Sequence, residues 1–364
     1  MTKDKNIKYK IITILFLVAI LLPNIIQVLD VEYRLINNEN RKYKTFPEFN
    51  IKSPIASIGD YKNYYLENFG LKTTLVNNYI NVKSNVLNEN PIPNRVVQGT
   101  DGWFFLGNNY NNVLNNSFGN DPFTEKEITN TIAYLRGLKD YFNSKNIAFY
   151  VVIPPDKNNI YQEFLPYKLK QNTTKLNVLK PLLKEKANIN IIDLSIPLLK
   201  NKNKQQLYYK TDTHWNYYGA YIGYNYTIDI IRKDFNLNKV AINDFEFINE
   251  IYTKGDLTKM INKIKDEPSI TIKKKVNSKA KLISKTNNTI HYQNNTKSLK
   301  TILFRDSFAT NWIPFFNESF QEIIYHKKHI INKNEIESFK PDIVIFEIIE
   351  RNIDMFGNTD IYKN

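Results

Sequence analysis

Short apolar runs alternate with helical patterns over most of the chain, and this alternation restricts the fold more than any other feature. The helical patterns cover residues 124–144 and 176–186, and Thr124 with Glu127 matches a capping box at the start of the first. The apolar, β-rich runs lie at residues 147–153, 189–194, 298–304, 322–325 and 343–348. Strands separated by helices form a parallel sheet with both faces covered. The sequence therefore predicts an α/β domain of doubly wound, flavodoxin-like architecture.

One apolar run leads directly to a serine. Ser307 follows Phe304 by three residues, where the chain turns towards a helix. Open α/β sheets place their chemistry at such carboxyl ends of strands, and backbone N–H groups there favour developing negative charge. A serine hydroxyl is a poor nucleophile without an adjacent base. Ser307 is thus either a nucleophile whose base comes from elsewhere or a simple helix cap.

An Asp-x-His pair supplies a candidate base. In an extended segment, residues two apart project to the same side, so Asp212 can orient the ring of His214 and hold one tautomer. Asn216 is the predicted N-cap of a helix that begins at Tyr217. Taken alone, the pair is better explained as a turn aspartate beside a satisfied, half-buried histidine. Together with Ser307 it completes a Ser-His-Asp set, whose chain order is no objection because triads are recognised by geometry.

Five blocks of the sequence carry a family resemblance. They are residues 97–106, 152–157, 211–216, 304–308 and 341–345. In this order they resemble the SGNH-hydrolase-like domain of the alginate O-acetylation proteins and their relatives with a DxHW signature. That family has a permuted triad order in which Asp and His precede Ser, as here. In related sequences a glycine commonly precedes Asp-Ser, whereas this chain has Arg305, which bears on the backbone shape around the serine.

The resemblance implies acyl transfer to a surface polysaccharide, with a multi-spanning membrane acyltransferase as the partner that exports the acyl group. We expect transfer of an acetyl group to a hydroxyl of an extracellular or cell-wall polysaccharide through an acyl-serine intermediate. Ser307 is the predicted nucleophile, His214 the base and then the acid, and Asp212 the orienting carboxylate. Further contacts to substrate, oxyanion or triad are predicted for Asn311, Asp156, Lys157, Arg351 and Trp215.

Two alternatives stay open for the same residues. In a deacetylase or esterase the same triad would form the acyl-enzyme, and water would attack it in place of a sugar hydroxyl. A non-catalytic, glycan-binding scaffold would keep the fold and tolerate loss of Ser307. No cofactor is expected, because the sequence has no acetyl-CoA motif and CoA is not expected outside the cell.

The charge and the absence of cysteine limit the partners. The formal charge is +14, with 50 Lys and Arg against 36 Asp and Glu, so an acidic polymer or an anionic membrane face is a reasonable partner. The run Lys273–Lys275 is either part of a groove for such a polymer or a solvated face. We find no nucleic-acid-binding module. With no Cys there is neither a disulfide framework nor a thiolate metal site, and no metal is expected.

The amino-terminal segment predicts a membrane anchor. Lysines at positions 3, 5, 8 and 10 precede residues 11–29, which carry no charge and are just long enough to span a bilayer core. The alternative is a cleaved signal peptide, but no small-x-small cleavage site follows the apolar run. We therefore expect a single-pass protein of the cell membrane with its catalytic domain outside.

Three regions follow from these patterns. Residues 1–30 form a cytoplasmic tip and a transmembrane signal-anchor. Residues 31–120 form an extension packed on the catalytic domain. Residues 121–364 form the SGNH-hydrolase-like α/β domain, with a Lys- and Asn-rich insertion near 244–293. This insertion is expected to be irregular or a β-hairpin and not part of the sheet.

Overall fold

The computed structural model describes residues 2–29, 45–168, 172–253, 255–263 and 265–357. The chain divides into two compact units, Met1–Pro91 and Ile92–Asn364. The boundary predicted near residue 120 lies inside the second unit, and residues 30–44 at the start of the predicted extension lie outside the described residues.

The first unit is helical. Its elements are α1 (Thr2–Leu29), α3 (Pro54–Asn68), α4 (Lys72–Asn81) and a π-helical turn η1 (Val82–Val86). Within α1, residues Ile7–Gln27 are long and apolar enough to cross a membrane. Proline suits the first position of α3, because the N–H that it lacks would have no partner there.

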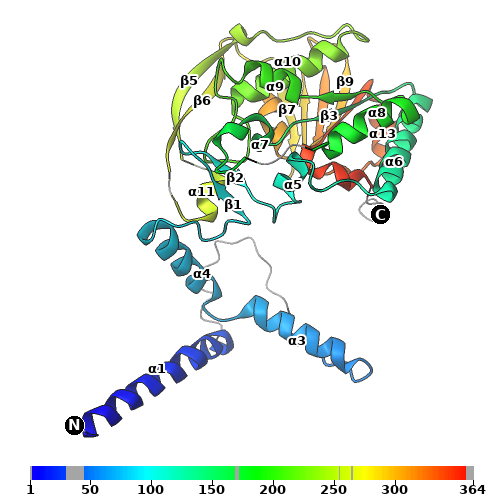
Figure 1. The fold of residues 1–364 in the computed structure, drawn as a ribbon. Coiled ribbons are helices and arrows are strands. Elements are labelled where there is room, and N and C mark those ends of the chain that lie inside the picture. The colour runs from blue at the N-terminus through cyan, green and yellow to red at the C-terminus, as the bar shows by residue number, and fades with distance from the viewer. Residues whose placement is uncertain (1, 30–44, 169–171, 254, 264, 358–364) are drawn as a thin grey trace. The chain divides into compact units, whose positions relative to one another are not determined.

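The second unit is built on a seven-stranded mixed sheet of order β4-β3-β11-β9-β10-β8-β7 (Figure 1). The five strands from β4 to β10 are parallel to one another. β8 is antiparallel to β10, and β7 is antiparallel to β8 and so runs in the same direction as the five. The strands are β3 (Ala148–Ile153), β4 (Ile191–Asp193), β7 (Lys281–Lys285), β8 (Thr289–Gln293), β9 (Lys300–Phe304), β10 (Glu322–His326) and β11 (Ile343–Glu347). The carboxyl-terminal part of the predicted insertion is therefore not outside the sheet. It supplies β8 and the edge strand β7.

Alternate side chains of the central strands enter two separate cores. On β9, Leu303 belongs to one core and Ile302 to the other, as the two-residue period of a strand requires. The first core packs against α10 (Tyr217–Ile231) and α12 (Ile313–Phe316). The second packs against α6 (Glu125–Ser144), α8 (Lys175–Ala187), α13 (Lys333–Phe339) and η5 (Glu350–Gly357). Both faces of the sheet are covered, which confirms the predicted α/β class.

The helix caps expected from the sequence are present. The side chain of Thr124 accepts from the backbone of Glu127, whose carboxylate accepts from Thr124 in return, so α6 begins with a capping box. Asn216 accepts from the backbone N–H groups of Tyr218 and Gly219 and caps α10. The second cap fixes the point at which the chain leaves the loop that contains His214.

A second, separate pair of strands forms a long hairpin. β5 (Phe245–Tyr252) and β6 (Glu267–Lys274) are antiparallel over their whole length, and α11 (Asp256–Met260) lies between them in the chain. Figure 1 shows the hairpin along one side of the unit, with α11 near the strand β2. The remaining elements are β1 (Val96–Gln98), β2 (Phe104–Leu106), α5 (Val113–Ser117), α7 (Lys157–Ile160), η2 (Gln162–Phe164), α9 (Ser195–Asn201), η3 (Ile242–Asp244) and η4 (Phe308–Trp312).

Candidate active site

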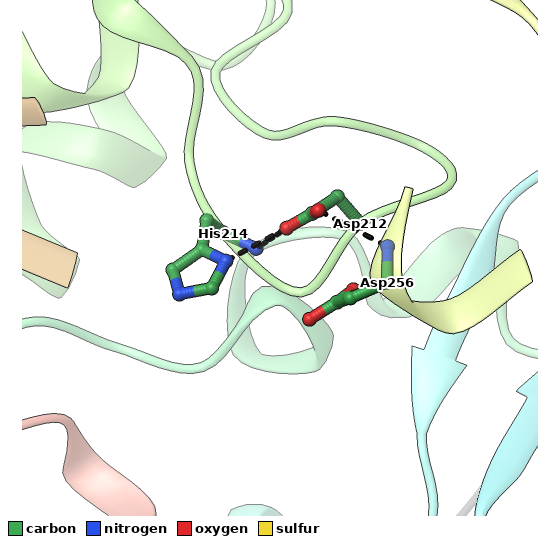
Figure 2. Close-up of side chains that lie close together, drawn as sticks. All are labelled: Asp212, His214 and Asp256. Atoms are coloured by element: carbon green, nitrogen blue, oxygen red, sulfur yellow. Dashed lines mark hydrogen bonds and ion pairs between the residues drawn. The ribbon is translucent and has the colours of Figure 1, made fainter. Parts of the chain in front are cut away.

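One hydrogen-bonded chain of side chains joins Asp212, His214 and Ser307. The Asp212 Oδ1 atom lies 2.7 Å from His214 Nδ1 and also accepts the His214 backbone N–H at 2.9 Å. On the other side of the ring, His214 Nε2 lies 2.7 Å from Ser307 Oγ. Figure 2 shows the His214 ring directed at the carboxylate of Asp212. The fold thus brings together three side chains that the sequence singled out, although Ser307 is 93 residues from His214.

The second oxygen of Asp212 also has two donors. The Tyr252 hydroxyl donates to Oδ2 at 2.8 Å and the Asp256 backbone N–H donates at 3.1 Å. Burial by itself favours the neutral acid, but the hydrogen bonds from His214 and Tyr252 and the charge of His214 lower the pKa of Asp212 to about 2. The carboxylate is therefore ionised at neutral pH. Neither Tyr252 nor Asp256 was predicted from the sequence.

His214 is set up as a base of raised strength. Burial disfavours the imidazolium, but the hydrogen bond and charge of Asp212 outweigh it, and the charge of Asp256 adds to them. The pKa of His214 is consequently above its ordinary value. A reaction that needs the neutral ring should accelerate as the pH rises through that raised pKa.

Ser307 lies exposed between the end of β9 and the start of η4. Its neighbour Asp306 shapes this turn, because one carboxylate oxygen accepts the backbone N–H of Phe308 at 2.8 Å and the other accepts that of Ile349 at 2.8 Å. The Asp306 backbone N–H donates to the buried carboxyl of Glu347 at 3.0 Å. The serine turn is therefore fastened to the end of the neighbouring strand β11.

Arg305 fits the position where related sequences commonly have glycine. Its backbone is not among those with positive φ, so this turn does not require the left-handed conformation that favours glycine. The guanidinium donates to the Asp306 carbonyl at 2.9 Å and to the Thr310 hydroxyl at 3.0 Å. The arginine side chain thus lies along the turn that presents Ser307.

Trp215 and Asn311 connect the histidine loop (residues 209–215) to the serine loop (residues 305–308). The fully buried Trp215 indole donates to the Phe308 carbonyl at 2.9 Å. The Asn311 amide donates to the Trp215 carbonyl at 3.1 Å. The indole is fully buried and has no surface open to a substrate, so we propose a positioning role for Trp215. The Asn311 amide has two N–H donors and the bond to Trp215 uses one of them, so the oxyanion contact of Asn311 stays a prediction.

Lys157 holds the histidine loop through three backbone carbonyl groups. Its ammonium donates to the carbonyls of Tyr209, Lys210 and Asp212 at 3.0, 3.2 and 2.6 Å. The nitrogen also lies 5.8 Å from the ring centre of Trp103 and 5.4 Å from that of Phe105. Burial lowers the pKa of Lys157 to about 8, against the opposing charges of Asp256, Asp212 and Glu267. Of the predicted roles, support of the triad loop fits these contacts.

Asp156 and Arg351 form a buried pair beside the serine loop. The Arg351 Nη1 atom contacts Asp156 Oδ1, and the Arg351 backbone N–H donates to Asp156 Oδ2 at 3.0 Å. The guanidinium carbon lies 5.6 Å from the ring centre of Phe308, the residue after Ser307. Burial disfavours the guanidinium, but the charges of Asp156 and Asp306 raise the pKa of Arg351 above its ordinary value. A permanent positive charge therefore lies next to the serine turn.

Ligand atoms of Asp212, His214 and Asp256 lie within 4.8 Å of one another, as in a metal site (Figure 2). Hydrogen bonds already account for these atoms. The Asp256 oxygens accept the backbone N–H and hydroxyl of Thr213 at 2.7 and 2.6 Å, while His214 and Asp212 bind each other. We therefore interpret the cluster as a hydrogen-bonded network and assign no metal to it.

The family model of the SGNH hydrolase-like domain of the acetyltransferase AlgX matches residues 96–299. This region covers more than half of the chain. The chain belongs to this family. The matched region contains Asp212 and His214 and ends before Ser307. The family predicted from the five sequence blocks is thereby confirmed.

Solved structures support the same fold. PatB1 of Bacillus cereus is 19% identical with a TM-score of 0.56, covering 72% of this chain and 98% of its own. The O-acetyltransferase domain of Pseudomonas putida AlgJ is 19% identical with a TM-score of 0.50, covering 71% of this chain and 92% of its own. At these identities the similarity establishes the fold. A comparison with curated proteins finds no match.

The first prediction concerns Lys157. Its pKa is about 8 in the folded chain and 10.5 as the ordinary value, so between these pH values the unfolded chain binds the extra proton. The free energy of unfolding should therefore rise with pH for the wild type relative to Lys157→Met, measured by chemical denaturation at pH 7 and 9.5. The exposed Lys126→Met serves as the matched control. A difference that does not change with pH would contradict the assignment.

Proposed function

We propose that the chain transfers an acetyl group to hydroxyls of an extracellular polysaccharide through an acyl-serine intermediate. The observation that carries the proposal is the hydrogen-bonded chain from Asp212 through His214 to the exposed Ser307 hydroxyl. The ionised carboxylate holds Nδ1 of the ring as the donor, which leaves Nε2 to accept the serine proton. Membership of an acetyltransferase family supports the choice of acyl group.

The reaction has two halves that use the same groups. First, His214 Nε2 takes the Ser307 proton while Oγ attacks the carbonyl carbon of the acyl donor, and His214 then protonates the leaving group. Second, His214 takes the proton of the acceptor hydroxyl, whose oxygen attacks the acyl-serine. The proton then returns to Ser307 Oγ as the ester bond to the enzyme breaks. The positive ring formed in each half is stabilised by the Asp212 carboxylate.

The oxyanion of each tetrahedral intermediate needs donors. Among the residues that the structure describes, no hydrogen bond uses the backbone N–H of Ser307, so this group is a candidate. Arg351 is the second candidate, because its described hydrogen bonds engage only Nη1 and the backbone N–H. Its guanidinium lies against Phe308, and its charge acts on His214. Fixed donors that face developing negative charge are often the largest single contribution to catalysis.

The proposed setting is the outer face of the cell membrane. The helix α1 contains a span suited to a signal-anchor, preceded by a lysine-rich tip. In that setting the acceptor is a surface polysaccharide, and the net positive charge suits an acidic one. The acyl donor is supplied across the membrane by the multi-spanning acyltransferase that the family resemblance implies.

The second prediction tests the triad in the full chain, kept in detergent micelles. With an activated acetyl ester, intact-mass measurement should find a stoichiometric acetyl adduct on the wild type and none on Ser307→Ala or His214→Ala. The double variant should be little worse than either single variant, because residues that act as a unit are not additive. Asp212→Asn should form the adduct roughly 10⁴-fold more slowly, since it spoils the tautomer and not the nucleophile.

The second half of the reaction separates the alternatives. Acetylated product that appears only when an oligosaccharide is added supports a transferase, whereas release of acetate at the same rate without acceptor supports an esterase. A structure of PatB1 carries a sulfonyl adduct, and a sulfonyl fluoride is a second probe for Ser307 here. Normal polysaccharide acetylation in cells that carry only Ser307→Ala would instead favour the scaffold.

The third prediction concerns Arg351. Lysine keeps a cation beside Asp156 but lacks the planar fork of N–H donors. Arg351→Lys should lower the rate constant of acetyl-enzyme formation by about 10²–10³-fold, as loss of one oxyanion donor does, with little change in ester KM. Stopped-flow measurement of the acylation burst gives both quantities. An unchanged burst rate in a variant with wild-type circular dichroism would exclude Arg351 as a donor.

A further inference from the structure

The hairpin β5–β6 and the helix α11 hold the loop that carries Asp212 and His214. Glu267, at the start of β6, accepts the Lys210 backbone N–H at 2.7 Å and the Thr211 N–H and hydroxyl at 2.8 and 2.5 Å. Asp256, at the start of α11, accepts the N–H and hydroxyl of Thr213. Each of the two carboxylates thus accepts at least one backbone N–H and one threonine hydroxyl within residues 210–213.

The contact to Asp212 itself comes from the other strand of the hairpin. Tyr252 is opposite Glu267 in the antiparallel register, so both residues belong to the same end of the hairpin. The Tyr252 hydroxyl donates to Asp212 Oδ2, and its ring stacks on Tyr209 with centres 4.1 Å apart. Unlike the bonds of Glu267, this one ends on a functional group of the proposed triad.

Between β5 and α11, the backbone at Gly255 comes very close to the loop that carries Asp212 and His214. A Cβ atom added at Gly255 would lie 2.5 Å from the Thr211 carbonyl oxygen and 2.4 Å from its hydroxyl. The next residue then donates its backbone N–H to Asp212 Oδ2. The approach leaves no room for a side chain at residue 255, and it places a peptide N–H where it can bind the carboxylate.

We infer that Tyr252 and Asp256 are positioning residues of the triad, which set the orientation of the Asp212 carboxylate and the charge that His214 experiences. Tyr252 and the Asp256 peptide occupy Oδ2, which leaves Oδ1 to hold His214 Nδ1. The Asp256 carboxylate adds a second negative charge near the ring. The hairpin is on this view part of the catalytic apparatus. The kinetic part of the inference rests on the proposed function.

The two residues act on His214 in opposite directions. Removing the Tyr252 hydroxyl leaves Asp212 Oδ2 with one donor fewer, which makes the carboxylate a stronger acceptor for the imidazolium and raises the pKa of His214. Asp256→Asn removes a nearby negative charge and lowers it. The charged groups that act on the ring are Asp212, Asp256 and Arg351. Lys157 binds the Asp212 carbonyl, and the Tyr209 ring stacks on Tyr252.

The kinetic test uses the full chain in detergent with p-nitrophenyl acetate. Loss of a hydrogen bond to a charged group corresponds to a fall of roughly 10–100-fold, so Tyr252→Phe should lower kcat by this factor with KM nearly unchanged. Gly255→Ala, which removes no hydrogen-bonding group, should lower kcat in the same manner. Tyr226→Phe and Asp229→Asn are the matched controls, and both should retain wild-type kcat.

A titration of the histidine rings by NMR tests the inference without any activity. The chain has four histidines, and the signal of His214 is assigned by its loss in His214→Gln. The pKa of His214 should rise in Tyr252→Phe and fall in Asp256→Asn. Shifts of the same sign, or none in either variant, overturn the inference whatever Ser307→Ala does. If the opposite shifts appear while Ser307→Ala keeps activity, the proposed function fails and the positioning of His214 stands.

Discussion

Parallel pairing of β3, β11 and β9 is the constraint on which the site depends. β11 lies between the other two strands, with Ile343 opposite Ala148 on one side and Thr301 on the other. Because parallel strands end at the same edge of a sheet, the loops after all three open there. The segments that follow these strands carry Lys157 at the start of α7, Arg351 in η5 and Ser307 just before η4. Backbone hydrogen bonding thus assembles one half of the site from three distant segments.

The other half of the site is the loop closed by the β-bridge between Tyr208 and Trp215, and three sets of contacts hold it in place. Lys157 binds its carbonyls, the Trp215 indole binds the serine loop, and the hairpin binds residues 210–213. A single hydrogen bond adds little net stability, but a loop that is bound at several points loses its freedom before any substrate arrives. The short distances from His214 to both partners are consistent with that fixation.

The sequence allowed prediction of the features that are local. The strands, the caps of α6 and α10, and the Asp-x-His pair can each be recognised within about ten residues, and Ser307 was found because a strand ends just before it. Tyr252, Asp256 and Glu267 act on a loop some 40 to 57 residues away, and nothing near them in the chain indicates that target. The sequence did not show that β7 joins the main sheet, because its five residues are all exposed and polar enough to resemble a loop. Such an edge strand lacks the apolar pattern by which the central strands are recognised.

The burial of Lys157 has a chemical consequence. A lysine whose pKa is lowered to about 8 is partly an uncharged amine in mildly alkaline solution, and such an amine competes with sugar hydroxyls for an activated acetyl group. Three carbonyls engage this amine beneath the loop, and its side chain is 3% exposed. Ser307, the proposed site of the acyl group, is exposed. Under the proposed function, burial therefore shields the lysine that holds the loop from self-acetylation.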